Sequence, residues 1–101
     1  MSIVETLLDE TGKLMQISAE ERNTLLCALQ NCKHSGVVGV TSLRVFHERG
    51  FPFVRILSTV KHINVSDAHK MFEDKGVTYE DFVCMIGIFA QDIKLRSQHG
   101  K

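Results

Sequence analysis

Residues 78–96 read TYEDFVCMIGIFAQDIKLR, and this stretch decides the fold of the chain. Its centre, residues 82–90, contains no charged side chain. With about 100° between successive residues of a helix, one broad apolar stripe forms, made of Phe82, Met85, Ile86, Phe89 and Ile93. Thr78 and Asp81 suit the start of such a helix, and Lys94 and Arg96 suit the negative end of its dipole. The pattern predicts a long C-terminal helix that ends near Arg96.

The same helix carries a second apolar stripe on nearly the opposite side, formed by Cys84, Ile88 and Leu95. A helix at the surface of a domain needs only one stripe to join the core. The second stripe must therefore be covered by the chain itself or by a partner. In the first case the helix runs through the centre of the domain. In the second case the small residues Gly87 and Ala90 would permit another helix to approach closely.

Two capping boxes predict helices in the first third of the chain. In Ser-Ile-Val-Glu (2–5) and Ser-Ala-Glu-Glu (18–21), serine and glutamate can each satisfy a free backbone N–H. We expect the first helix to stop at Gly12. The second should run to about Cys32, with Leu25, Leu26 and Leu29 facing inward, and end in the segment 34–36.

Three shorter helices are predicted between these and the long one. Thr41 would cap a helix to about Arg49, which Gly50 ends. Pro52 suits the first turn of the next helix, whose apolar stripe is Phe53, Ile56, Leu57, Val60 and Ile63. Ser66 would cap a fifth helix that ends at residues 75–76. The apolar run 37–40 is too short and too rich in glycine to predict a strand.

These elements predict an all-α fold, a compact single-domain bundle of five or six short helices with a long C-terminal helix. The domain would occupy residues 1–96, with 97–101 as a disordered tail. A chain of 101 residues with 44% hydrophobic and 24% charged residues is typical of one globular domain. No apolar run is long enough to span a membrane, and the acidic N-terminal segment does not resemble an export signal. We therefore expect a cytoplasmic protein with three reduced cysteines.

The net charge is zero, but the charges are unevenly distributed. Residues 1–21 contain five acidic side chains and one basic one, whereas residues 22–70 contain seven basic and two acidic side chains. Such an asymmetry can indicate an acidic partner. The alternative is that the acidic ends fold against the basic middle.

Motifs that would indicate catalysis or a cofactor are not found. Cys27, Cys32 and His34 do not form a zinc motif, because the two cysteines point to different sides of a helix. The chain has no glycine-rich phosphate loop, and its five histidines are scattered. We expect no enzyme activity, no catalytic residue, no metal and no other cofactor.

The segment GVTYEDFV (76–83) resembles the second half of an EF-hand, a family of calcium-binding helix–loop–helix proteins. Lys70, Phe72 and Asp74 stand where the oxygen ligands should be. The resemblance therefore implies a calcium-free form that keeps only the helix pairing. Segments 45–57 and 71–83 also align with each other, and both predict a helix end, a glycine in a left-handed turn and a new helix.

Two functions remain open. The preferred one is a small protein-interaction module or regulator that binds a partner protein, or itself as a homodimer, through Cys84, Ile88 and Leu95. The alternative is DNA or RNA binding by a helix–turn–helix-like pair at 41–64. The polar side of its second helix would then contact nucleic acid through Arg55, Ser58, Thr59, Lys61 and His62. The neutral balance of charge makes that alternative the weaker one.

Overall fold

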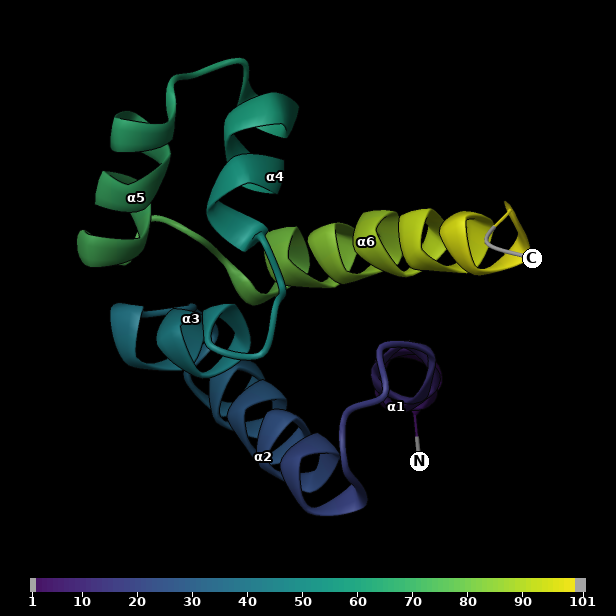
Figure 1. The fold of residues 1–101 in the computed structure, drawn as a ribbon. Helices are drawn as coiled ribbons and strands as arrows, with labels where there is room; N and C mark the ends of the chain where they lie inside the picture. Colours follow the sequence, from purple (N-terminus) through teal and green to yellow (C-terminus); the bar gives the residue numbers. More distant parts are fainter. Residues whose placement is uncertain (1, 100–101) are drawn as a thin grey trace.

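The computed structural model describes residues 2–99. It contains six helices, which are α1 (Ile3–Leu14), α2 (Ala19–Ser35), α3 (Val40–His47), α4 (Phe53–Lys61), α5 (Val65–Glu73) and α6 (Tyr79–His99) (Figure 1). The described chain forms no strand, only an isolated antiparallel bridge between Val37 and Thr78. The all-α prediction with a long C-terminal helix is confirmed. Over the described range, no helix combines the length and the apolar character needed to cross a bilayer.

Helix α6 packs mainly against α1 and also against α4. In Figure 1, α6 lies in the plane of the picture, α4 and α5 stand above its first turns, and α2 and α3 lie below them. The short helix α1 is seen end-on beneath the second half of α6 and packs against both α6 and α2. The radius of gyration is 13.0 Å, as expected for a compact domain of about 100 residues.

Backbone hydrogen bonds link two loops that are far apart in sequence. The loop after α2 meets the loop before α6, where the Val38 N–H donates to the Val77 carbonyl at 2.9 Å. The Tyr79 N–H donates to the Gly36 carbonyl, also at 2.9 Å. The side chains of Val38 and Val77 are fully buried beside these bonds. The apolar run at 37–40 thus contributes one bridge to the fold.

Several helix starts differ from the prediction. Ser2, Ser18 and Thr78 accept hydrogen bonds from the N–H groups of Glu5, Glu21 and Asp81, as predicted for α1, α2 and α6. The reciprocal bond from the acidic side chain is formed at α1 and α6 but not at α2, where Glu21 lies 3.8 Å from Arg49 instead, so the predicted box at 18–21 is only half formed. The predicted caps Thr41 and Ser66 are wrong. Instead, α3 begins after Gly39, and α5 begins after Asn64, whose side chain accepts from the Asp67 N–H at 2.7 Å. An amide oxygen accepts the capping hydrogen bond as well as a hydroxyl does, so Asn64 and Ser66 are competing candidates for the N-cap of α5. Helix α3 begins without any side-chain cap.

The core is built around five phenylalanines that contact one another, Phe46, Phe51, Phe53, Phe82 and Phe89. The Phe82 ring lies 5.1 Å from that of Phe46 and 4.9 Å from that of Phe53, both edge to face. This geometry suits the quadrupoles of aromatic rings. The cluster joins α3, α4 and α6, so the predicted inward faces of these helices meet in one core.

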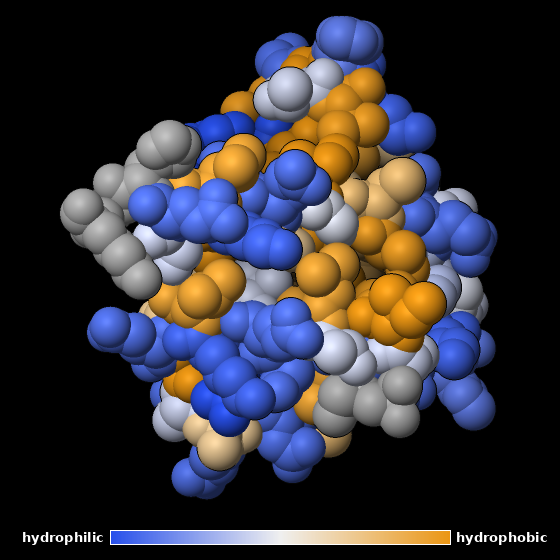
Figure 2. All heavy atoms as spheres, turned by 90° about the vertical axis from the view of Figure 1, so that its right-hand side faces the viewer, coloured by the Kyte–Doolittle hydropathy of each residue, from blue (hydrophilic) through white to orange (hydrophobic). Residues whose placement is uncertain are grey.

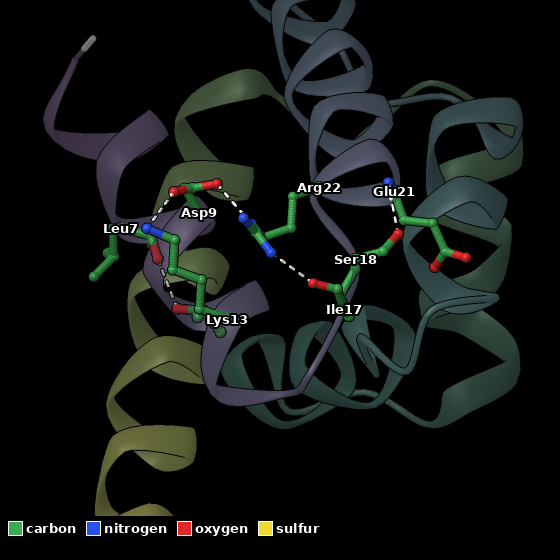
Figure 3. A network of polar contacts seen from close by, with 8 residues as sticks. Leu7, Asp9, Lys13, Ile17, Ser18, Glu21 and Arg22 are labelled. Atoms are coloured by element: carbon green, nitrogen blue, oxygen red, sulfur yellow. Dashed lines mark hydrogen bonds and ion pairs between the residues drawn. The ribbon is translucent and has the colours of Figure 1, made fainter.

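Arg22 of α2 fastens α1 to the rest of the domain (Figure 3). Its Nε donates to Asp9 Oδ1 at 3.0 Å, and its Nη1 donates to the Ile17 carbonyl at 2.7 Å. Lys13 Nζ lies 3.4 Å from the other oxygen of Asp9. Partial burial raises the pKa of Asp9, but the hydrogen bonds and charges of Arg22 and Lys13 outweigh this effect and lower it overall. The acidic N-terminal segment therefore does fold against a base from the middle of the chain.

Gly12 does not stop α1, contrary to the prediction. It is buried inside the helix, where the side chain of Arg22 passes over it. A Cβ at this position would lie 2.9 Å from both Cγ and Cδ of Arg22. Met15 ends the helix instead, and Gln16 follows with a φ of 63°. The glycine therefore serves close packing.

Gly12→Ala and Gly87→Ala should have opposite effects on stability. Both glycines lie inside helices, where alanine is favoured by about 0.5–1 kcal/mol. A Cβ on Gly87 meets no atom within 4 Å, so Gly87→Ala should gain that amount. Gly12→Ala should lose about 1–2 kcal/mol, because it displaces Arg22 from hydrogen bonds to a charged group. Urea denaturation of both variants measures this, and equal shifts would contradict the packing role of Gly12.

The ends of three other elements also correct the prediction. Helix α4 stops at Lys61 because His62 takes the left-handed conformation, with a φ of 57°. Val60, predicted in the apolar stripe of this helix, is 43% exposed. In the turn before α6 the left-handed residue is Lys75, not Gly76, whereas Gly50 takes that role before α4. Helix α6 continues past Arg96 to His99, since no glycine or proline interrupts it there. Of the predicted tail, residues 100–101 lie outside the described range.

Candidate interaction surface on α6

The predicted inward stripe of α6 forms the centre of the core. Phe82, Met85, Ile86 and Phe89 are buried, and Ile93 is half-buried against the core. Within this stripe, the ring of Phe82 packs against Phe53 of α4 and against Phe46 of α3. The burial of this stripe sets the orientation of α6, so the opposite side of the helix faces solvent.

The second stripe of α6, Cys84, Ile88 and Leu95, is exposed, and we refer to it as the outer stripe. Ile88 is 48% and Leu95 46% exposed, and Cys84 is exposed as well. Helix α6 is therefore not buried all round, and of the two possibilities left by the sequence, the helix running through the centre is excluded. Ala90, however, is buried toward α1, near Leu7 and Thr11, and is not free for another helix.

A shallow groove adjoins the outer stripe between α4 and α6. Its apolar lining includes Pro52, Ile56 and Ile88. Polar residues border it, with Arg55 and Thr59 on α4 and Asp92 and Arg96 on α6. The Asp92 carboxylate and Arg96 Nη2 are 2.8 Å apart, one helical turn from each other. An apolar centre with a polar border is the usual composition of a protein interface.

Sequence reasoning identified the outer stripe but not the groove beside it. Ile56 was assigned wholly to the core, and Arg55 only to the nucleic-acid alternative. The groove depends on how closely α4 packs against α6, and periodicity within each helix carries no information about that distance. One overlooked signal was local: Gln91 lies on the same side as the stripe, so positions 84, 88, 91 and 95 follow a spacing of four, three and four.

A second apolar area lies where α1 meets the second half of α6. Leu7, Leu14 and Ala90 line a groove there together with Glu10 and Lys94. Ile3 and Leu14 are exposed at 87% and 47%. Figure 2 looks at this end of the molecule, where apolar side chains reach the surface between hydrophilic ones. The apolar surface of the protein is therefore not confined to the outer stripe.

The residues of the nucleic-acid alternative are only partly available on α4. Arg55 and Thr59 are exposed, but the Ser58 hydroxyl donates to the Ile63 carbonyl at 2.5 Å. Lys61 Nζ lies 3.8 Å from Asp81 Oδ1, and His62 is the left-handed residue that ends the helix. An ion pair to a carboxylate reduces the attraction of a lysine for phosphate. These five residues therefore present less positive charge than the sequence indicates.

The cysteines and histidines of the described chain do not gather into a metal-binding group. Within residues 2–99, no group of three or more metal-ligating side chains lies close enough to hold an ion. Cys27 is exposed while Cys32 is buried. Burial raises the pKa of the Cys32 thiol, although a hydrogen bond with Ser42 acts against this, so the thiol stays protonated at neutral pH. Cys32 is accordingly a core side chain.

We compared the chain with protein-family models, with curated protein sequences and with solved structures, and none of them matches it.

Proposed function

We propose that this protein is a non-enzymatic interaction module or small regulator that binds an α-helix through the outer stripe of α6. The helix belongs either to a partner protein or to α6 of a second copy. Binding itself is the activity, because the bound helix occupies an apolar face that would otherwise remain in water. We also propose a cytoplasmic location, which the three free cysteines support.

The observation that carries this proposal is the spacing of the exposed residues on α6. Positions 84, 88, 91 and 95 alternate four and three residues apart, and apolar side chains occupy three of them. This alternation is the repeat of a seam between two helices that cross at a small angle. Gln91 stands in the middle of the seam, where one polar residue can fix the register of the partner.

The border of the groove beside the stripe supports a helical partner with charges of its own. Arg55 of α4 has no ion pair among the described residues, and Asp92 and Arg96 follow Ile88 by one and two turns of α6. Charges at the border of an interface set orientation and association rate more than affinity. The remaining alternative, nucleic-acid binding through α4, would require Arg55 and Lys61 to act together.

Ile88→Glu should leave the protein folded and abolish its association. Ile88 is 48% exposed, so the loss of stability should be about 1 kcal/mol or less. A carboxylate on the seam would lose part of its hydration on binding, and it would replace the apolar contact that Ile88 makes with the bound helix. Sedimentation velocity across a range of concentrations measures association, and circular dichroism melting confirms the fold. The association of the wild-type protein should change little with salt, because the seam is apolar.

Val60→Glu is the matched control, since it places the same charge on an exposed valine of α4 outside the stripe. It should associate as the wild-type protein does. If the wild-type protein is monomeric throughout, the partner is a different protein, recovered from host extract by the wild type and not by Ile88→Glu. A folded Ile88→Glu variant with unchanged association refutes the proposal. Salt-sensitive binding of a DNA or RNA probe, lost on charge reversal of Arg55 and Lys61, would favour the alternative.

A further inference from the structure

A cleft opens between α3, α4 and α5, on elements that do not include the outer stripe. Its inner part, about 160 Å³, has an apolar lining of Val40, Leu43 and Val54. The inner part continues into a wider outer part of about 600 Å³ that also contains Val65, which is 55% exposed. Val54, His47 and His69 line both parts, so they form one continuous depression. In Figure 1 these three helices lie together at the left of the molecule.

The polar side chains around the inner part are all basic or neutral. They are Arg44, His47 and His69, and no carboxylate lines this part. Arg44 is exposed and forms no ion pair with any described residue. Of the carboxylates in the outer part, Glu73 lies 3.1 Å from His69 Nδ1, and Asp74 shares this part with Lys70, with which it forms no ion pair. A ligand with a negative charge is therefore favoured at the inner end of the cleft.

The volume of the inner part suits a single apolar group. A cavity of about 150 Å³ accommodates a benzene molecule. A phenylalanine or leucine side chain could therefore occupy the space between Val40, Leu43 and Val54. The wider outer part provides room for the residues that follow such an anchor in a peptide, which a small organic acid would leave empty.

We propose that this cleft binds an acidic peptide segment of a partner protein. The segment would place one large apolar side chain in the inner part and a neighbouring carboxylate against the guanidinium of Arg44. Arginine is well suited to this, since its planar group can donate two parallel hydrogen bonds to one carboxylate. The strongly basic middle of the chain, residues 22–70, supplies all the residues of the inner part. This site is separate from the α6 seam, and either can exist without the other.

The test uses a fluorescein-labelled peptide, Glu-Glu-Phe-Leu-Glu-Glu, and its counterpart with lysine in place of glutamate. Fluorescence anisotropy gives the affinity of the whole chain for each. We expect the affinity of the protein for the acidic peptide to be at least about tenfold higher than its affinity for the basic one. In NMR spectra of the isotope-labelled protein, the acidic peptide should shift the backbone amides around Arg44, His47 and His69, and leave those around Ile88 unchanged.

Two variants separate charge from shape. Arg44→Glu should weaken binding of the acidic peptide about tenfold or more, because it places like charges together. Lys33→Glu makes the same change in net charge at an exposed lysine of α2 that lines neither this cleft nor the groove beside the outer stripe, and should stay within about twofold of the wild type. Val54→Phe fills the inner part without changing the charge and should also abolish binding. Melting curves of each variant exclude unfolding as the cause.

Four results would overturn the proposal. The first is no binding of the acidic peptide up to about 1 mM, the limit of weak specific association. The second is an equal loss in Arg44→Glu and Lys33→Glu, which would indicate unspecific attraction. Shifts confined to α6 would place the peptide on the outer stripe. The fourth is binding of 3-phenylpropanoate as tightly as the peptide and with the same shifts, which would identify the ligand as a small carboxylate and not a protein segment.

Discussion

Replacing Phe82 with alanine is expected to lower the free energy of unfolding by about 3–5 kcal/mol. The ring is fully buried and packs edge to face against both Phe46 and Phe53. Its removal leaves a cavity between three helices whose positions are fixed by other contacts, so the site cannot collapse fully. The total free energy of unfolding of a small domain is only about 5–15 kcal/mol, so urea denaturation should show a large shift of the unfolding midpoint.

Ile88→Ala is the control for this substitution, on the same helix but on its exposed side. With 48% of the side chain already in water, its removal should change stability by about 1 kcal/mol or less. A loss at Ile88 as large as that at Phe82 would contradict the assignment of inner and outer stripes. A small loss at Phe82 would show that the aromatic cluster is not the centre of the core.

Replacing Val77 with aspartate should destabilise the fold by about 3–5 kcal/mol, as expected for a buried charge without a partner. Val77 is fully buried, and its carbonyl accepts the hydrogen bond from Val38 that links the two loops. A carboxylate there would either remain ionised in an apolar surrounding or bind a proton at neutral pH, and both are unfavourable. Thermal melting followed by circular dichroism should show a strongly lowered or absent transition.

Val65→Asp introduces the same chemical change at an exposed position. Val65 is the first residue of α5, and a negative charge at the N-terminus of a helix is stabilised by the helix dipole. The variant should be about as stable as the wild type, within about 0.5 kcal/mol. Equal melting temperatures for Val77→Asp and Val65→Asp would mean that the loop pairing at Val77 contributes little to the fold.

The candidate surface was predictable to the extent that it depends on one helix. Because the side chains of a helix repeat every 3.6 residues, the sequence alone separates the stripe of Phe82 from the stripe of Ile88. Which stripe faces water is not a local property. It follows from the phenylalanines of α3 and α4, which meet Phe82 and Phe89 and so turn Ile88 outward. The cleft around Arg44 requires three helices and has no signature in any of them.

The sequence by itself determined the six helices and the fold class, because hydrophobic periodicity and breaks at residues such as Gly36 and Gly50 act within a few residues of each other. The tertiary structure decided how glycines and caps are used. Glycine is a residue type that often ends helices, so Gly12 looks like a helix stop in the sequence. In the structure the side chain of Arg22 packs over it, and this contact joins residues ten apart in sequence. Burial and close approach are properties of pairs of elements, so they arise only when the helices pack.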